Sequence, residues 1–128
     1  MILFKLEPKY IRTKDGRLID LTAYIKGEEI NGGIKFIHKI NGNFFFVQID
    51  NILKKSNDIK ELCDEFVVFY ENHASGIVYH DLEWAKTKAQ KSSNKSIICG
   101  AIWVIDKNGI PTLKSVAKVN EKGDLEPL

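Results

Sequence analysis

A tryptophan and several lysines recur at helical spacing in the segment that follows Asp81. At about 100° per residue, Leu82, Ala85 and Ala89 share one face of a helix. The opposite face carries Trp84, Lys88, Lys91 and, if the helix extends that far, Lys95. Ammonium groups bind phosphates or carboxylates, and an indole can stack or fill a pocket, so this face is predicted to contact a partner. An ordinary alternative stays open, in which Trp84 folds back over the core and the lysines are simply solvated.

The region around this helix is basic, although the chain as a whole is not. Residues 83–118 hold seven lysines and two acidic residues, a net charge of +5, against +2 for all 128 residues. Lys86, Lys114 and Lys118 would extend a lysine surface from the helix onto a strand. Such a surface predicts direct nucleic-acid binding as the alternative function. Only two basic residues of the chain are arginines, however, and arginine supplies the planar fork that reads bases and phosphates most specifically.

Histidines with acidic neighbours are the residues to consider for catalysis or metal binding. Metal sites place ligands in close pairs such as CxxC or HxxxH, and His73, His80 and Cys63 lack that spacing, so no metal is predicted. The chain also lacks the GxSxG, HExxH, Walker and GxGxxG motifs. These absences disfavour an enzyme, and the sequence assigns no catalytic residue and no cofactor. A small hydrolase or nuclease that uses His80 and Asp81 stays as a third function.

Turn signals divide the first half of the chain into hairpins. Asp15-Gly16 and Asn41-Gly42 each stand between strand-like runs, a pattern typical of tight hairpin turns. Strands are expected over residues 2–6, 10–13, 18–25, 34–40 and 44–49.

Helical signals enter in the second half. Asp58 and Asp81 are predicted to cap a short helix over residues 59–63 and the main helix from Leu82 to about Lys91. Further strands are expected over residues 65–71, 77–80, 96–106 and 112–119, the last of them with a bulge because its apolar residues break strict alternation.

Length and composition fit one domain of ordinary size. Of the 128 residues, 44% are hydrophobic and 28% are charged, close to globular averages. We expect a single α+β domain over residues 1–120, a mainly antiparallel sheet built from hairpins, followed by a polar C-terminal tail over residues 121–128. The first residues do not form an export signal, and no apolar run approaches the roughly 20 residues of a membrane helix. A cytoplasmic protein is therefore expected.

Several aromatic and sulfur-bearing residues are predicted to be core. Trp103 lies mid-strand, where its large apolar area favours burial. In the run Phe44-Phe45-Phe46, successive residues face opposite ways, so either both faces are covered or Phe45 is exposed, and coverage of both is favoured. Cys63 and Cys99 are expected to be reduced core residues, and whether they meet stays open.

Three stretches carry a family resemblance. They read DIKELCDEFV at residues 58–67, GAIW at 100–103 and VAKVNEKGDLE at 116–126. Together they resemble a group of small phage and prophage proteins of low-GC Gram-positive bacteria, with the pattern TIEELCDEFV, YGAIW and VAKMNxKGELE. The positions at which the chain departs from that pattern include Cys99 and Val119. The resemblance implies a phage accessory protein that acts inside an infected bacterium, and it brings no site residues with it.

These observations predict a non-catalytic phage or mobile-element accessory protein that binds and inhibits a bacterial host protein. The setting implied by the resemblance is rich in small inhibitors, so a defence nuclease such as a CRISPR effector is the expected target class. The target is expected to be a protein or a nucleoprotein complex, with no membrane partner, and self-association stays open. The expected contact residues are Trp84, Lys88, Lys91 and Lys95.

Overall fold

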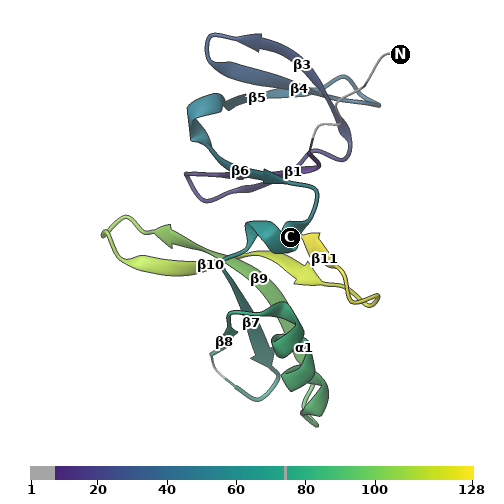
Figure 1. Ribbon diagram of the computed structural model, residues 1–128, viewed down its shortest axis with the longest axis vertical. Helices are drawn as coiled ribbons and strands as arrows, with labels where there is room; N and C mark the ends of the chain where they lie inside the picture. The colour runs from purple at the N-terminus through teal and green to yellow at the C-terminus, as the bar shows by residue number, and fades with distance from the viewer. Residues whose placement is uncertain (1–7, 74) are drawn as a thin grey trace. The chain divides into compact units, whose positions relative to one another are not determined.

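The computed structural model describes residues 8–73 and 75–128, and the strand expected over residues 2–6 lies outside the described residues (Figure 1). The chain forms two compact units, Met1–Asp58 and Ile59–Leu128. The strand pairs described below lie within one unit or the other. The single domain expected over residues 1–120 stays a prediction.

The described part of the first unit, residues 8–58, forms two three-stranded antiparallel sheets, in the orders β2-β1-β6 and β3-β4-β5. Its strands are β1 (Tyr10–Thr13), β2 (Leu18–Asp20), β3 (Tyr24–Ile30), β4 (Gly33–His38), β5 (Phe44–Gln48) and β6 (Ile52–Ser56), with a 3₁₀ turn η1 (Ile49–Asn51) before β6. Side chains of both sheets form one core, which contains Ile11, Leu21, Ile34, Phe36 and Val47. The predicted hairpins at Asp15-Gly16 and Asn41-Gly42 are confirmed as β1–β2 and β4–β5.

The strand expected over residues 18–25 is wrong, because the chain turns after Asp20. The Asp20 carboxylate accepts hydrogen bonds from the backbone N–H of Thr22 (2.9 Å) and from its hydroxyl (2.7 Å). The Tyr24 N–H then donates to the Leu21 carbonyl at 3.0 Å. An Asp side chain that bonds two residues ahead gives the backbone a local turn in place of a strand ladder.

The phenylalanine run also differs from both expected arrangements. Phe45 is half-buried against the core, whereas Phe44 and Phe46 are 57% and 47% exposed. Cross-strand register explains this, because Phe45 pairs with buried Phe36 and therefore shares its face of the sheet. Phe44 and Phe46 share the opposite face, where their rings lie edge to face with their centroids 5.8 Å apart.

The β1–β2 turn holds an acidic residue whose pKa is perturbed. Asp15 accepts hydrogen bonds from the Thr13 hydroxyl and from Arg17 Nε at 3.2 Å, and these bonds lower the pKa of the Asp15 carboxyl from 3.8 to about 2. A lowered pKa means that the folded state favours the charged form, so Asp15 stabilises the unit above pH 3.8. That stabilisation is lost as the pH falls through about 2.

Asp15→Asn is expected to lower the free energy of unfolding by less than about 1 kcal/mol near neutral pH, since the carboxylate is half exposed and screened by water. Urea unfolding of both proteins, from neutral pH down to about pH 2, measures the difference. The difference should shrink as the pH falls below the ordinary pKa of Asp. A difference that stays constant with pH would show that the charge of Asp15 does not contribute.

The second unit is one five-stranded antiparallel sheet with a helix on one face (Figure 1). The strand order is β11-β10-β9-β7-β8. Its elements are a short 3₁₀ helix η2 (Ile59–Leu62), β7 (Glu65–Tyr70), β8 (Ile77–Tyr79), α1 (Leu82–Lys91), β9 (Ser96–Ile105), β10 (Pro111–Val119) and β11 (Leu125–Pro127). Leu82 and Ala85 of α1 pack with Phe66 and Val68 of β7 in its core. With antiparallel sheets and one α-helix, the fold is of the α+β class.

Local signals predicted this unit well in three places. The main helix spans Leu82–Lys91, and the Asp81 side chain caps it by accepting a hydrogen bond from the Trp84 N–H at 3.3 Å. The short helix is present over Ile59–Leu62, although as a 3₁₀ helix. The bulge expected in β10 lies between Ser115 and Ala117. Among the described residues, no helix has both the length and the apolar character needed to cross a membrane.

Two predictions for this unit are wrong. Residues 121–128 are not simply a polar tail, because β11 returns to the sheet and pairs with β10 through Val119↔Leu125 and Ala117↔Pro127. Trp103 is not core: it is 49% exposed, whereas its neighbour Ile102 is 1% exposed. Alternate residues of a strand face opposite sides, and Ile102 occupies the side that packs inward.

Candidate functional site

Helix α1 presents a tryptophan and two lysines on its outer face. Trp84, Lys88 and Lys91 occupy positions i, i+4 and i+7, which form one stripe at 3.6 residues per turn. All three are exposed, and Trp84 is 58% exposed despite its large apolar surface. We call these three residues the Trp84 stripe. Trp84 therefore does not fold back over the sheet, whereas the other half of that alternative, in which the lysines are simply solvated, stays open.

Lys95 does not belong to this helical stripe. The helix ends at Lys91, and Lys95 directly precedes β9, where its carbonyl accepts a hydrogen bond from the Glu71 N–H at 2.9 Å. It borders an open cavity of about 650 Å³ lined by Phe69, Tyr70, Glu71, Lys95, Ser96 and Ile97. Burial raises the pKa of the neighbouring Tyr70 hydroxyl, and Tyr79 adds to the effect.

Lys86 has a structural contact. Its Nζ donates to the Gly123 carbonyl at 2.7 Å, and the Glu83 carboxylate lies 3.7 Å away. This hydrogen bond ties α1 to the turn between β10 and β11. The nearby Glu83 carboxylate offsets part of the Lys86 charge, which makes this lysine less available to an incoming phosphate.

Lys114 and Lys118 point to opposite faces of the sheet. Lys114 pairs with Ile102, and Lys118 pairs with Cys99, and these two β9 residues lie on different sides of their strand. Burial raises the pKa of the Cys99 thiol, while Ser115 and Lys118 partly offset that rise. The set Lys86, Lys114 and Lys118 therefore does not form one continuous cationic face.

His80 pairs with a residue that the sequence analysis missed. Its Nδ1 lies 2.7 Å and 2.6 Å from the two carboxylate oxygens of Glu65, which is buried while His80 is exposed. Asp81 instead caps α1. The missing signal is strand register: Phe66 pairs with Tyr79, so Glu65 and His80 extend the same ladder by one position.

A histidine oriented by a carboxylate can act as a general base. Nucleophilic catalysis also needs a nucleophile within hydrogen-bond distance of that histidine. His73 contacts the Tyr70 ring, with centroids 5.9 Å apart. Within residues 8–73 and 75–128, no group of three or more His, Cys, Asp or Glu side chains is arranged to hold a metal ion. The pairing of His80 with Glu65 therefore does not by itself define a reaction.

The second unit also has an exposed apolar sheet face that sequence reasoning missed. Phe69, Ile97, Trp103 and Ile105 are all exposed, and Phe69 pairs with Ile97 across β7 and β9. Every β9 residue from Ile97 to Ile105 is apolar or glycine, so the sequence does not indicate which side of the strand is buried.

The residues of the Trp84 stripe are thus the predicted contact residues that share one surface, and Lys95 lies outside it. Comparisons with protein-family models, with curated proteins and with solved structures found no match to this chain.

Proposed function

We propose that this chain is a phage or mobile-element accessory protein that binds a bacterial host protein through the Trp84 stripe and inhibits it. The observation that carries this proposal is the exposure of Trp84 on the outer face of a capped helix. Buried Leu82 and Ala85 already anchor α1 to the sheet, so the core does not require the indole. An exposed tryptophan is the residue type most enriched among the dominant contacts of protein interfaces.

The two lysines of the stripe favour an acidic surface on the partner. Lys88 and Lys91 follow the indole along the helix toward its C-terminus, so a partner that accepts Trp84 in a pocket would place acidic side chains on that side of the pocket. The target class, a defence nuclease such as a CRISPR effector, comes from the resemblance of residues 58–67, 100–103 and 116–126 to phage proteins. Inhibition follows if the bound helix covers part of the channel through which the nuclease takes its substrate.

Trp84→Ala is expected to weaken binding to the host partner about thirtyfold, because loss of an interface tryptophan commonly costs about 2 kcal/mol or more. The measurement is capture from lysate of a low-GC Gram-positive bacterium with tagged wild type and variant, with and without nuclease treatment. A captured protein is then tested for inhibition of its activity by the wild type.

Trp103→Ala is the matched control, since it removes the same side chain at similar exposure from a strand of the sheet rather than from α1. The proposal predicts that Trp103→Ala keeps the partner and Trp84→Ala loses it. Loss of the partner in Trp103→Ala and its retention in Trp84→Ala would contradict the proposal, because the contact would then lie on the face of the sheet that carries Trp103. Capture that disappears after nuclease treatment would favour direct nucleic-acid binding, and its salt dependence would then be steep.

A further inference from the structure

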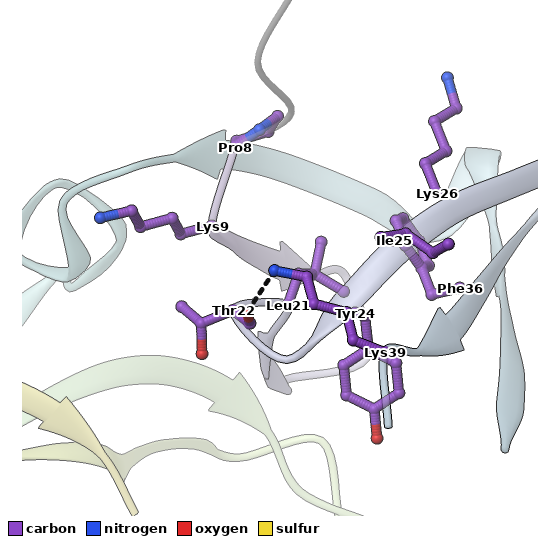
Figure 2. Close-up of a pocket in the computed structure, with 9 residues that line it drawn as sticks. All are labelled: Pro8, Lys9, Leu21, Thr22, Tyr24, Ile25, Lys26, Phe36 and Lys39. Atoms are coloured by element: carbon purple, nitrogen blue, oxygen red, sulfur yellow. Dashed lines mark hydrogen bonds between the residues drawn. The ribbon is translucent and has the colours of Figure 1, made fainter. Parts of the chain in front are cut away.

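The first unit contains a cavity that lies outside the Trp84 stripe. Its volume is about 360 Å³, and Figure 2 shows the residues that line it. They come from the chain before β1, the turn after β2, the start of β3, and β4 with the residue that follows it: Pro8, Lys9, Leu21, Thr22, Tyr24, Ile25, Lys26, Phe36 and Lys39. A volume of this size is at the lower end of the range of small-molecule sites.

The base of the cavity is apolar and aromatic. Leu21 and Phe36 belong to the core of the unit, and half-buried Tyr24 packs against it. The Tyr24 ring is held on one side by Phe45, with centroids 4.9 Å apart, and on another by His38 at 5.1 Å. These contacts fix the ring, so an apolar ligand would meet a formed surface rather than mobile side chains.

Lysines supply the charge of the cavity. Lys9, Lys26 and Lys39 line it, and no Asp or Glu is among the described residues of the lining. The Lys39 side chain reaches Thr22, as the dashed line in Figure 2 shows, and its Nζ donates to the Thr22 carbonyl at 3.2 Å. An ammonium has three protons, so this bond leaves donors for a ligand. Lys26 pairs with Glu29 at 3.2 Å, and in Figure 2 the side chains of Lys9 and Lys26 point away from Tyr24 and Phe36. Lys39 is therefore the lysine best placed to meet an anion beside these aromatic rings.

Backbone hydrogen bonds hold the walls in place before any ligand arrives. The Leu21 N–H donates to the Lys9 carbonyl at 2.7 Å, and the Lys39 N–H donates to the Ala23 carbonyl at 2.9 Å. The Lys9 N–H in turn donates to the Asn57 side chain at 2.9 Å. A preformed site avoids the ordering cost that a flexible loop would impose on binding.

We propose that this cavity binds a small organic anion, with an aromatic or aliphatic body against Tyr24 and Phe36 and an acidic group at Lys39. The apolar base favours the body of such a ligand, and the one-signed charge of the lining favours its acidic group. Lysine rather than arginine at the rim suits a single carboxylate, sulfonate or phosphate approached as a point charge. The site is independent of the Trp84 stripe.

Naphthalenesulfonate is the probe, and backbone amide chemical shifts of the full chain are the readout. The proposal expects saturable shifts at Thr22, Ile25 and Lys39, and binding at least several-fold tighter than that of uncharged naphthalenemethanol. Lys39→Ala should weaken binding about tenfold, the effect of one hydrogen bond to a charged group. Lys9→Ala keeps the bond between Lys39 and Thr22, and it should weaken binding less than Lys39→Ala does.

Lys35→Ala is the control, because Lys35 lies on β4 beside Phe36 but over the Phe44 ring, 4.2 Å from its centroid. Equal binding of the neutral probe would overturn the proposal, and so would shifts centred on Phe44 and Phe46. Equal loss in Lys35→Ala and Lys39→Ala would do the same, since it would indicate a general charge effect. Absence of saturable binding, or binding of an acidic peptide alone, would also reject a small-anion site.

Discussion

Ile11→Ala is expected to destabilise the Met1–Asp58 unit by about 2–5 kcal/mol, the range for truncation of a fully buried isoleucine. Ile11 is 1% exposed and lies on β1, the central strand of the β2-β1-β6 sheet. Its side chain packs in the cluster that joins this sheet to the β3-β4-β5 sheet. Loss of its methyl groups would leave a cavity where the two sheets meet, and surrounding strands can relax only partly.

The positions of the tryptophans make this experiment informative about the two units. Trp84 and Trp103 both belong to Ile59–Leu128, so tryptophan fluorescence reports on that unit, whereas far-UV circular dichroism reports on both. In urea, Ile11→Ala should shift part of the circular dichroism transition to a lower urea concentration. The midpoint of the fluorescence transition should stay unchanged. Leu62→Ala, a residue 1% exposed in the second unit, should move the fluorescence midpoint instead.

Coincident shifts of both probes in both variants would contradict independent units. That result would mean that the chain unfolds as one cooperative domain, as its length and composition predict. The expectation of separate transitions rests on the two separate hydrophobic clusters, each of which draws its members from one unit.

Turns and helix caps, which depend on residues close together in the sequence, could be predicted, as the N-terminus of α1 illustrates. Asp81 supplies a side-chain acceptor for an unpaired helical N–H, and this requires only residues three positions apart. The turns at Asp15-Gly16 and Asn41-Gly42 are equally local, because glycine accepts the positive φ of +87° at Gly16 and +73° at Gly42. Such signals depend little on the rest of the chain.

The burial of a side chain and its contacts with other elements depend on strands far away in the sequence, and these were predicted less well. The position of Trp103 depends on which side of β9 faces the core, and an all-apolar strand carries no alternation from which to decide. The contact between Glu65 and His80 depends on the register of β7 with β8. Lys86 appeared free for a partner, but its bond to Gly123 joins residues 37 positions apart. These three misses concern residues whose surroundings lie on another element, whereas the turn after Asp20 is a local feature that the sequence analysis also missed.

Gly100→Ala is expected to destabilise the second unit by about 1–3 kcal/mol, the usual cost of forcing an extra carbon into a packed core. Gly100 lies in β9 between Phe66 of β7 and Ala117 of β10. An added Cβ would lie 2.6 Å from the Cys63 Sγ, far inside normal contact distance, and 3.5 Å from the Ala117 Cβ. Urea unfolding followed by tryptophan fluorescence measures the loss.

The cost should vanish when the sulfur is removed, because Gly100 owes its identity to the space that Cys63 occupies. In the Cys63→Ala background the nearest atoms to the new Cβ are the Ala117 Cβ at 3.5 Å and the residue 63 Cβ at 3.6 Å, which are ordinary contacts. Alanine also restricts the unfolded chain more than glycine does, so the second substitution should then be neutral or slightly stabilising. The double-mutant cycle should give a favourable coupling of about 1–3 kcal/mol. Gly100→Ala could instead lower the free energy of unfolding equally with and without the Cys63 sulfur. That result would contradict the prediction, because the Cys63 Sγ would then not be the atom that excludes a side chain at position 100.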